Sequence, residues 1–329
     1  MPNREDDLIE RIRRGMPSNV GGDLRVGIGD DAAVLSSGPG KEWVLSCDQF
    51  LENAHFRMEV HPPEVVGYKA LARATSDLGA MGARPRLFLL SLALPAERTG
   101  RWLDRMISGM RRAARRFGLR LAGGDTAKSG LVALNLTVLG DIVSGDAVLR
   151  SGARPGDSVF VSGRLGGAQL GLKLVLQSAR QRVRWRRLLR PHYYPELAIG
   201  LGVWLARRRM ASAMMDLSDG LSTDLGRLCH ASGVGARIDA RAIPAVIVPE
   251  ALRRRGHDPL ALALHGGEDY GLLFAVPKRL VGRIPDSFDG TRITRIGEIV
   301  RGREVELVDL SGKTKPLEAK GWDHFRRGG

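Results

Sequence analysis

The sequence predicts two successive domains in which strands alternate with helices, and three observations support this fold class. With 329 residues, the chain is long enough for two ordinary domains that each bury a core. A Pro-Gly turn within residues 150–157 interrupts the pattern near the middle of the chain. Residues 139–143 are echoed by residues 296–300, near the ends of the two halves, which indicates related α/β domains. We therefore place the domains at residues 1–148 and 149–329.

In the first half, hydrophobic spacing defines each element in turn. A short amphipathic helix is predicted through Leu8, Ile9 and Ile12. Residues 63–81 form a long helical pattern with small and apolar residues along one stripe. Apolar or alternating runs bounded by Gly, Pro or Asp predict strands. In order, strands are expected at residues 24–28, 43–46, 87–94, 119–126 and 131–142, and an arginine-rich helix at residues 101–117.

The second half is predicted by the same spacing rules. A strand at residues 159–161 precedes a helix that opens at Gly166 and extends to about residue 178. A basic segment follows, and a helix over residues 195–208 leads to a strand that ends at Asp216 and runs into another helix. The remaining pattern predicts short helices near Pro249 and Pro259, and strands at residues 237–239, 272–276, 294–300 and 305–310.

Composition places the chain among soluble globular proteins. Hydrophobic residues make up 43% of the sequence and charged residues 26%. The longest apolar run, residues 87–94, contains Ser91 and stops at Pro95, so no membrane span is expected. The first fourteen residues are rich in acidic side chains, unlike a secretory signal. The two cysteines, Cys47 and Cys229, lie too far apart to suggest a metal pair, and we expect a cytoplasmic protein.

The net charge of +15 permits two interpretations of the arginine clusters. They could form a nucleic-acid surface, or they could be solvated faces of helices. The clusters lie within helical patterns whose other faces are apolar, and they lack the interleaved aromatic residues of single-strand binders. We therefore expect solvated helix faces and no nucleic-acid partner. The clusters comprise Arg111, Arg112, Arg115 and Arg116, residues 180–190, residues 207–209 and residues 253–255.

The segment at residues 216–221 carries the strongest chemical signal in the chain. Asp216, Ser218 and Asp219 lie where an apolar strand runs into a helix, and no basic residue occurs between Met210 and Arg227. Two carboxylates held this close repel each other, and burying them is costly unless a cation compensates their charge. We interpret the missing partner as a divalent metal ion rather than a side chain.

Four further aspartates follow glycine-rich or apolar segments in the first 130 residues: Asp31, Asp48, Asp77 and Asp125. Each has an ordinary explanation when taken alone. The glycines before Asp31 fit a hairpin turn with Asp at its tip, and they fail as a dinucleotide fingerprint because no helix opens there. An aspartate late in a helix, as at Asp77, is usually solvated or a cap. Their recurrence favours a shared function.

Together, these six carboxylates indicate magnesium chemistry. Hard oxygen donors suit Mg²⁺, which is bound jointly by a few carboxylates and substrate phosphates. We therefore predict a site that holds several Mg²⁺ ions and a polyphosphate. The sequence contains neither a P-loop nor the protein-kinase motifs, so an ATP enzyme with this sequence would hold the phosphates through metals.

Seven motifs follow one another along the chain: G-I-G-D-D, S-x-D, S-D-L-x-A-M-G-A, G-G-D-T, D-x-S-D-G-L, G-G-E-D-Y and G-W-D-H-F. Their order resembles the thiamine-monophosphate kinase family, within the superfamily of aminoimidazole ribonucleotide synthetase and selenophosphate synthetase. The resemblance covers residues 27 to 325. It implies ATP-dependent phosphorylation of thiamine monophosphate to thiamine diphosphate. It also implies an N-terminal α/β domain whose sheet pairs with a second subunit in a homodimer, and a C-terminal α+β domain.

The resemblance also implies roles for individual residues. The N-terminal domain would bind metal and ATP, and the C-terminal domain would complete the active site. Asp48, Asp216 and Asp219 would stand at the catalytic centre. The implied Mg²⁺ ligands are Asp31, Ser46, Cys47, Asp48, Asp77, Asp125, Asp216 and Asp219. Gly124, Asp125, Arg150 and Ser218 would contact ATP, whereas His55, Glu268 and Trp322 would hold the thiamine moiety.

The chemistry of these side chains agrees with the implied roles. Trp322 offers a flat face to a cationic ring, although a tryptophan taken alone is more typical of a core or an interface. Glu268 can accept a hydrogen bond from an aminopyrimidine. This sequence departs from the family pattern at Cys47. A thiol is a poor Mg²⁺ ligand, so only a contact through the backbone would fit there. A phosphate nucleophile is already ionised near neutral pH, so direct in-line transfer needs no general base.

Two alternatives remain open at this point. One is another ATP-dependent enzyme of the same superfamily that activates an amide oxygen or a carbamoyl group. Trp322 and the G-G-E-D-Y motif argue against it. The other is a basic nucleic-acid-binding protein that uses the arginine clusters.

Overall fold

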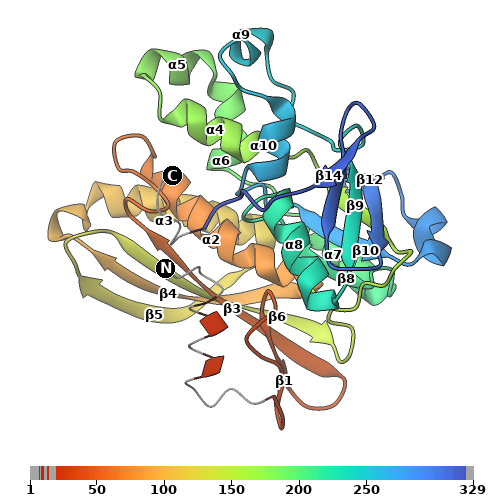
Figure 1. Ribbon diagram of the computed structural model, residues 1–329. Helices are drawn as coiled ribbons and strands as arrows, with labels where there is room; N and C mark the ends of the chain where they lie inside the picture. The colour runs from red at the N-terminus through yellow and green to blue at the C-terminus, as the bar shows by residue number, and fades with distance from the viewer. Residues whose placement is uncertain (1–6, 8, 11–12, 15–19, 324–329) are drawn as a thin grey trace.

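The computed structural model describes residues 7, 9–10, 13–14 and 20–323, and Figure 1 shows two sheets that pack against shared helices. The described residues of the predicted N-terminal helix are helical, but Leu8 and Ile12 lie outside the described residues, as do His324 and Phe325. Among the helices described, none combines the length and apolar character needed to cross a bilayer.

The first sheet has six strands in the order β1-β2-β3-β6-β4-β5. Neighbouring strands are antiparallel except β4 and β5, which run parallel. A parallel pair needs a crossover connection, and helix α3 (Arg101–Phe117) provides it, after the short 3₁₀ helix η1 (Ala96–Arg98). The strands are β1 (Leu24–Val26), β2 (Ala33–Ser36), β3 (Lys41–Leu51), β4 (Arg84–Leu94), β5 (Arg120–Lys128) and β6 (Ala133–Val143).

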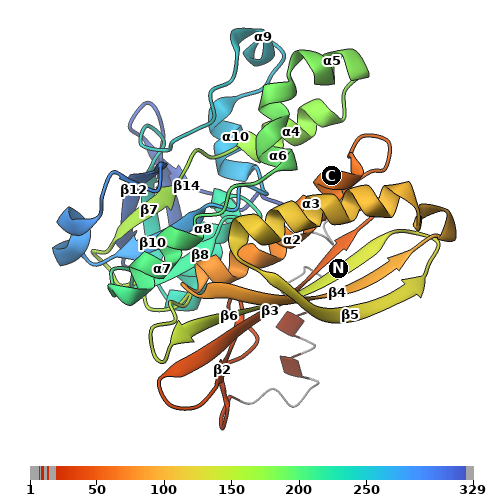
Figure 2. The ribbon, with the colours of Figure 1, turned by 180° about the vertical axis from the view of Figure 1, so that it is seen from behind.

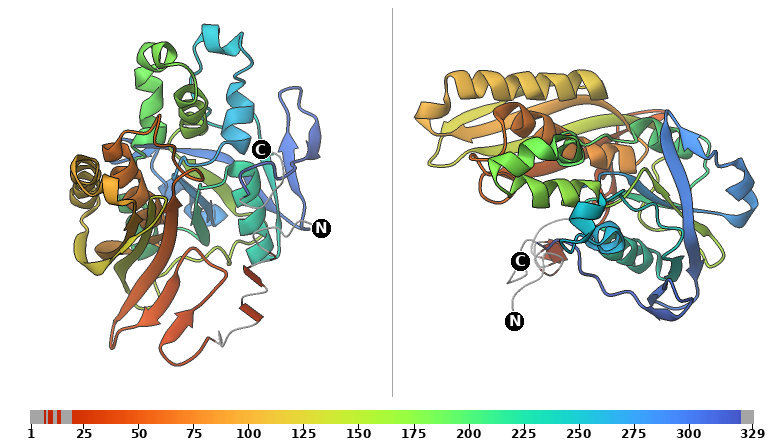
Figure 3. Two further views of the ribbon diagram at one scale, coloured as in Figure 1. Left: turned by 90° about the vertical axis from the view of Figure 1, so that its left-hand side faces the viewer. Right: turned by 90° about the horizontal axis from the view of Figure 1, so that it is seen from above.

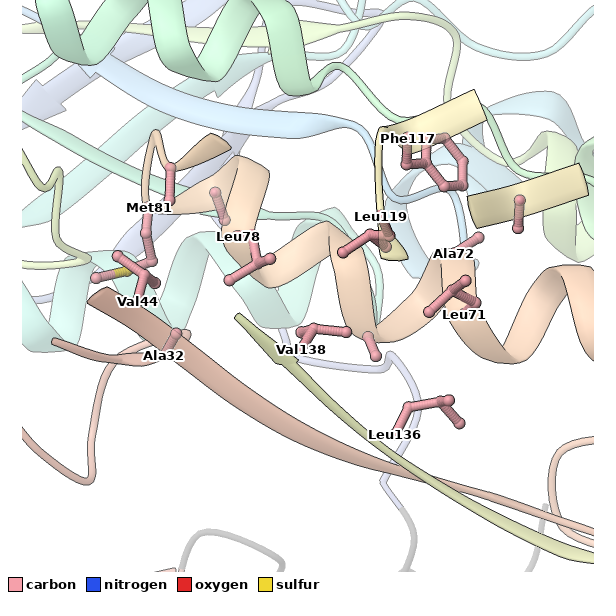
Figure 4. Packing of buried hydrophobic residues seen from close by; sticks show 14 of the residues in the cluster. Ala32, Val44, Leu71, Ala72, Leu78, Met81, Phe117, Leu119, Leu136 and Val138 are labelled. Carbon is pink, nitrogen blue, oxygen red and sulfur yellow. The ribbon is translucent and has the colours of Figure 1, made fainter. Parts of the chain in front are cut away.

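Helix α2 (Pro63–Ala80) lies at the centre of the molecule. One side packs on β3 and β6 of the first sheet, and other sides meet α3, α7 and β8. Nearly all of its residues are buried, because small and apolar side chains surround the helix axis. Figure 4 shows Leu78 and Met81 near Val44 in this core. Gly67 of α2 and Gly109 of α3 allow close approach, because a Cβ at either position would collide with the other helix's backbone.

The second sheet follows the order β14-β13-β9-β12-β7-β10-β8, with β11 paired to β12. Helix α8 (Leu221–Ser232) packs on one face of this sheet, and α7 (Ile199–Arg207) packs on the other, so both faces are covered. The strands are β7 (Ser158–Ser162), β8 (Ala213–Asp216), β9 (Gly235–Asp239), β10 (Leu272–Val276), β11 (Ser287–Phe288), β12 (Thr291–Val300), β13 (Val305–Val308) and β14 (Thr314–Pro316).

A small helical lobe rises above the two sheets (Figures 1 and 2) and has its own apolar cluster. Figure 3 shows the lobe from two further sides. It contains α4 (Gly167–Val175), α5 (Ala179–Arg184), the 3₁₀ helix η2 (Arg186–Leu189), α6 (Arg190–Tyr193), α9 (Glu250–Arg253) and α10 (Pro259–His265), whereas a further 3₁₀ helix, η3 (Lys278–Arg283), follows β10.

The prediction of two domains that mix helices and strands is confirmed. Both sheets are mostly antiparallel, with one parallel pair in each: β4 with β5 in the first and β9 with β13 in the second. The arginine side chains of the four clusters are exposed, except Arg182, which is half-buried. Both interpretations of the clusters require exposed side chains, so the solvated helix faces remain a prediction. The boundary between residues 148 and 149 remains a prediction.

Two expectations about strand ends are wrong. Strand β3 does not stop at Ser46 but continues through Asp48 to Leu51, and β5 continues through Gly124 and Asp125 to Lys128. The reason is that extended pairing with β6 and β4 overrides the local glycine and aspartate signals. Around residues 29–31, β1 and β2 pair antiparallel, so the hairpin interpretation of that backbone is correct.

Candidate active site

Most of the residues singled out in the sequence border one cavity of about 350 Å³. The lining comes from both halves of the chain, so neither half could form the cavity alone. A larger cavity of about 740 Å³ lies elsewhere, is bordered by several arginines, and contains none of the predicted site residues. The predicted residues on the smaller cavity are Asp31, Ser46, Cys47, Asp48, His55, Asp77, Arg150, Asp216, Ser218, Asp219, Glu268 and Trp322.

Three carboxylates meet at the centre of this site. One ligand atom from each of Asp31, Asp77 and Asp216 lies within 4.8 Å of the other two. They come from the β1–β2 hairpin, the last turn of α2 and the end of β8, respectively. Hydroxyl groups donate to two of them: Ser46 to Asp77, in a short hydrogen bond, and Ser76 to Asp216 at 2.7 Å.

Burial and mutual repulsion make these carboxylates hard to ionise. Burial raises the pKa of Asp31 to about 6, against the opposing charge of Arg150. Burial and the charge of Asp31 raise the pKa of Asp216 to about 7. The pKa of Asp77 is raised well above its ordinary value by burial and by Asp48, Asp216 and Asp31. A cation at this position would remove the main obstacle to ionisation.

The donor set fits Mg²⁺. The buried Oδ2 of Asp31 has no hydrogen-bond partner among the described residues. Asp31, Asp77 and Asp216 present hard oxygen atoms, and no nitrogen or sulfur donor belongs to this group. An unpartnered buried carboxylate oxygen beside two others is the arrangement that a hard cation stabilises.

Arginines nevertheless compensate part of the acidic charge. Arg150 donates to Asp31 at 3.0 Å and 2.5 Å, Arg73 pairs with Asp48 at 3.3 Å, and Arg227 forms a close ion pair with Asp219. The expectation that no side chain compensates the acidic segment is therefore wrong for Asp219. Among the described residues, the hydroxyl groups of Ser46 and Ser76 are the only side-chain donors to Asp77 and Asp216.

Sequence reasoning missed Arg73 and Arg227, although helical spacing could have found them. Arg73 precedes Asp77 by one turn of α2, and Arg227 lies on α8, directly after the acidic loop. It also missed buried Asp224, whose Oδ2 accepts from the backbone N–H groups of Asp219 and Gly220 at 3.1 and 3.0 Å. Asp224 therefore holds the loop that carries Asp219.

Asp125 and Gly124 do not reach the carboxylate group within one chain. They lie on β5, an edge strand whose nine residues are all exposed. Strand β5 is three positions from β3 in the sheet, which corresponds to roughly 14 Å at the usual strand spacing. The Sγ of Cys47 lies 3.1 Å from Oδ1 of Asn135, on the neighbouring strand β6.

The three predicted substrate residues also border the cavity. His55 accepts a hydrogen bond at Nδ1 from the backbone of Leu51 at 2.9 Å. Glu268 adopts a left-handed backbone conformation, with φ of 67°, and its N–H donates to the carbonyl of Ser218 at 2.7 Å. Trp322 is 50% exposed, so the interpretation of this residue as part of a core is wrong.

The fold and site define a class that comparison with known families identifies. The model for the AIR synthase related protein N-terminal domain matches residues 29–142, and that for the C-terminal domain matches residues 154–309. The chain is therefore an AIR synthase related protein with both domains.

Comparison with curated relatives identifies the family within this class. The chain is 37% identical to the thiamine-monophosphate kinase of Salmonella typhimurium over 310 residues, covering 92% of this chain and 93% of the relative. It is 34% identical to that of Aquifex aeolicus over 323 residues, covering 98% of both chains. The chain belongs to the thiamine-monophosphate kinase family.

Solved structures agree. AaThiL complexed with AMPPCP and TMP superposes with a TM-score of 0.82 at 33% identity, covering 98% of this chain and 97% of that one. The thiamine-monophosphate kinase from Stenotrophomonas maltophilia gives a TM-score of 0.72 at 34% identity, with coverages of 92% and 94%. The hydrogenase maturation protein HypE in complex with ATP, at 22% identity and a TM-score of 0.68, shares the fold.

Proposed function

We propose that this chain phosphorylates thiamine monophosphate with ATP, giving thiamine diphosphate and ADP. The observation that carries the proposal is the convergence of Asp31, Asp77 and Asp216 in one cavity that Glu268 and Trp322 also border. This arrangement occurs in a chain 37% identical to a thiamine-monophosphate kinase over nearly its whole length. The relative's substrate and the acidic cavity thus support the same reaction.

The acidic side chains would hold Mg²⁺. Bound Mg²⁺ supplies positive charge that offsets repulsion between two phosphate-bearing substrates: two unit charges about 4 Å apart repel by ~4 kcal/mol at an effective dielectric constant near 20. The central ligands would be Asp31, Asp77 and Asp216. The remaining proposed ligands are Ser46, Asp48, Asp125 and Asp219, and the backbone of Cys47.

The other residues would bind and align the two substrates. Arg150 and Ser218 border the cavity near the carboxylates and would contact ATP phosphates. The acceptor phosphate carries its own ionised oxygen, so these residues need to position it in line rather than remove a proton. Asp48, Asp216 and Asp219 would stand closest to the transferred group. No covalent enzyme intermediate is expected.

The thiamine moiety would occupy the part of the cavity bordered by His55, Glu268 and Trp322. Thiamine carries a cationic ring and an aminopyrimidine, and the partly exposed Trp322 offers a flat face to either. Glu268 contributes negative charge. Lys69 and His192 outweigh the effect of burial and lower the pKa of Glu268, which keeps it ionised.

A homodimer would bring Gly124 and Asp125 to an active site. The face of the first sheet opposite α2 exposes apolar side chains, among them Leu89 and Leu121, and β5 is exposed throughout. Such a face favours pairing with a second copy. In that arrangement, residues 1–148 would form the dimerising domain, and β5 of one subunit would approach the site of its partner.

Mixed dimers test this arrangement. Asp125→Asn and Asp216→Asn should each be inactive alone. If Asp125 acts in the partner's site, an equal mixture of the two variants should regain about a quarter of the wild-type activity. About half of the dimers are then heterodimers, and each heterodimer has one intact site of its two. If Asp125 acts within its own subunit, each site of a heterodimer lacks either Asp125 or Asp216. Mixing then restores no activity, and the arrangement is wrong.

Substrate choice tests the function itself. ATP consumption should depend on thiamine monophosphate, with thiamine diphosphate as product, and should be absent with aminoimidazole precursors or selenide. Turnover with either of those and not with thiamine monophosphate would favour the other synthetases of the superfamily. A salt-dependent shift of random DNA without kinase activity would instead favour the nucleic-acid interpretation. The cytoplasmic location remains a prediction.

A further inference from the structure

Behind Glu268 lies a buried hydrogen-bond network that joins the two halves of the chain. Lys69 Nζ lies 2.7 Å and His192 Nδ1 3.0 Å from the same oxygen, Oε2 of Glu268. The side chains of Lys69 and His192 are each 1% exposed, whereas Glu268 is 24% exposed. Lys69 comes from α2 and His192 from α6, so both halves of the chain hold one carboxylate.

Two proton arrangements fit the distances in this network. In the first, the N–H of Arg57 donates to Nδ1 of His61 at 3.0 Å, Nε2–H of His61 donates to Nε2 of His192 at 3.0 Å, and Nδ1–H of His192 donates to Glu268. In the second, Lys69 donates to Nδ1 of His192 at 3.1 Å, Nε2–H of His192 donates to His61, and Nδ1–H of His61 donates to the carbonyl of Arg57 at 3.1 Å. Both histidines are neutral in either arrangement, and burial lowers the pKa of each. Only the first arrangement lets His192 hold Glu268 directly.

Either arrangement leaves one oxygen of Glu268 available. Oε2 accepts from Lys69 in both arrangements and also from His192 in the first, whereas Oε1 receives no hydrogen bond among the described residues. The left-handed φ of Glu268, at 67°, is uncommon for a residue with a Cβ, so its side chain leaves the backbone in a direction that the surroundings must enforce. Glu268 and His192 border the acidic cavity, whereas Lys69 does not, and the side chain of His192 is only 1% exposed. Lys69 can thus act on a substrate only through Glu268.

We propose that Lys69 and His192 are positioning residues: they fix Glu268 so that its Oε1 receives the nitrogen-rich, cationic ring system of the acceptor substrate. This inference rests on the proposed function and deepens it. The network sets the affinity for thiamine monophosphate and leaves phosphoryl transfer to the carboxylates around Asp216. A purely structural ion pair would lower stability without a selective change in KM.

Steady-state kinetics of the full-length protein test the inference. Lys69→Met and His192→Leu should raise the KM for thiamine monophosphate about 10- to 100-fold, while the KM for ATP and kcat change by less than about threefold. His192→Asn, which can place a donor near the position of Nδ1, should recover much of the lost affinity. The matched controls are Lys173→Met, on the exposed side of α4, and His257→Gln, between α9 and α10.

The two hypotheses fail in different ways. If wild type does not phosphorylate thiamine monophosphate, the proposed function is wrong, and so is the substrate named for Glu268. If wild type does so and folded Lys69→Met or His192→Leu keeps the wild-type KM, this inference alone is wrong. Equal losses for both substrates would also contradict it, because they indicate a structural role.

Nitrogen NMR of histidine-labelled wild type gives a readout that needs no variant. The inference requires the first arrangement, with the Nε2–H tautomer of His61 and the Nδ1–H tautomer of His192. Finding His192 protonated on Nε2 would overturn the inference even if a variant fails to fold.

Discussion

Two buried clusters of ionisable side chains border the same cavity, and they balance their charge in opposite ways. The acidic cluster, Asp31, Asp77 and Asp216, gathers like charges. The glutamate network, Glu268 with Lys69, His192 and His61, matches its carboxylate with a buried lysine and a buried histidine. The first cluster carries surplus negative charge when its carboxylates ionise, whereas the second is balanced within the chain.

This difference in charge balance suits the two clusters to two tasks of a kinase site: binding metal with phosphate, and recognising the ring system of the substrate. A cluster with surplus negative charge can accept metal together with phosphate, because each added cation relieves repulsion. A balanced network keeps one geometry whether or not ligand is bound, which suits recognition of a fixed ring system. The two clusters should therefore respond differently to substitution, metal and pH.

The largest expected effect is the loss of catalysis when the acidic cluster loses one charge. Asp216→Asn keeps size and shape but removes a central carboxylate, and kcat should fall by a factor on the order of 10³ or more. The fold should survive, because the substitution removes repulsion in the metal-free protein. Circular dichroism checks the fold, and a coupled kinase assay measures kcat. Full activity in Asp216→Asn would remove the basis for a catalytic acidic cluster.

Magnesium should stabilise the protein through the acidic cluster alone. A ligand at 100 times its dissociation constant stabilises the native state by about 2.7 kcal/mol, which thermal unfolding resolves as a shift of several degrees. We expect this shift in wild type and in Lys69→Met, and a much smaller one in Asp216→Asn. Chelator should reverse it. An equal shift in Asp216→Asn would show that Mg²⁺ binds elsewhere.

These two clusters also show how far the sequence could lead. Asp31, Asp77 and Asp216 were predictable because each ends or follows an element with a distinctive glycine-rich or acidic signature. Lys69 and His192 carried no such signal. Lys69 falls within a helical pattern, where a lysine normally marks the solvated face, and His192 follows an arginine-rich segment. Only the packing of α2 between the two halves turns Lys69 inward.

For Asp125, the sequence indicated a role but not a position in the fold. Its motif predicted a role in the site, yet the sheet order places β5 at an exposed edge. Strand pairing over long sequence separation decides that position, and no local pattern encodes it. Similarly, the pairing of Asp219 with Arg227 depends on the capped turn that opens α8.

The pH dependence of stability should have opposite signs for the two clusters. In the metal-free protein, the pKa of Asp216 is about 7 against an ordinary 3.8, so the folded state holds its proton more tightly than the unfolded state. Its contribution to stability is present below about pH 4 and is lost as pH rises towards 7, by on the order of 2–4 kcal/mol. Asp216→Asn should therefore gain stability relative to wild type over this range.

His61 provides the contrasting case. Burial lowers its pKa to about 3 from an ordinary 6.5, so the unfolded state binds a proton first as pH falls. Its contribution is present above pH 6.5 and is lost as pH falls towards 3. His61→Gln should lose stability relative to wild type as pH rises. Urea unfolding at several pH values, with chelator present, gives both slopes. Slopes of the same sign would contradict the contrast between the clusters.

Removing one hydroxyl from the acidic cluster should have a smaller effect. Ser76 is buried, and its Oγ donates to Oδ2 of Asp216 at 2.7 Å. Ser76→Ala leaves that oxygen without its donor, which should raise the pKa of Asp216 further and cost about 1–2 kcal/mol in transition-state stabilisation. The kcat should fall about 10-fold, and higher Mg²⁺ should restore part of it. An unchanged kcat would mean that Ser76 does not tune Asp216.

The smallest expected effect concerns the exposed arginines. Arg253, Arg254 and Arg255 lie on or just after α9, in the helical lobe, and none of them borders the acidic cavity. Replacing all three by glutamine removes three positive charges from an exposed surface, where ion pairs contribute roughly 0–1 kcal/mol. The kcat and both KM values should stay within about twofold of wild type at physiological salt, because screening limits long-range attraction of anionic substrates. A large rise in both KM values that disappears at high salt would instead show that the lobe's charge guides substrates to the cavity.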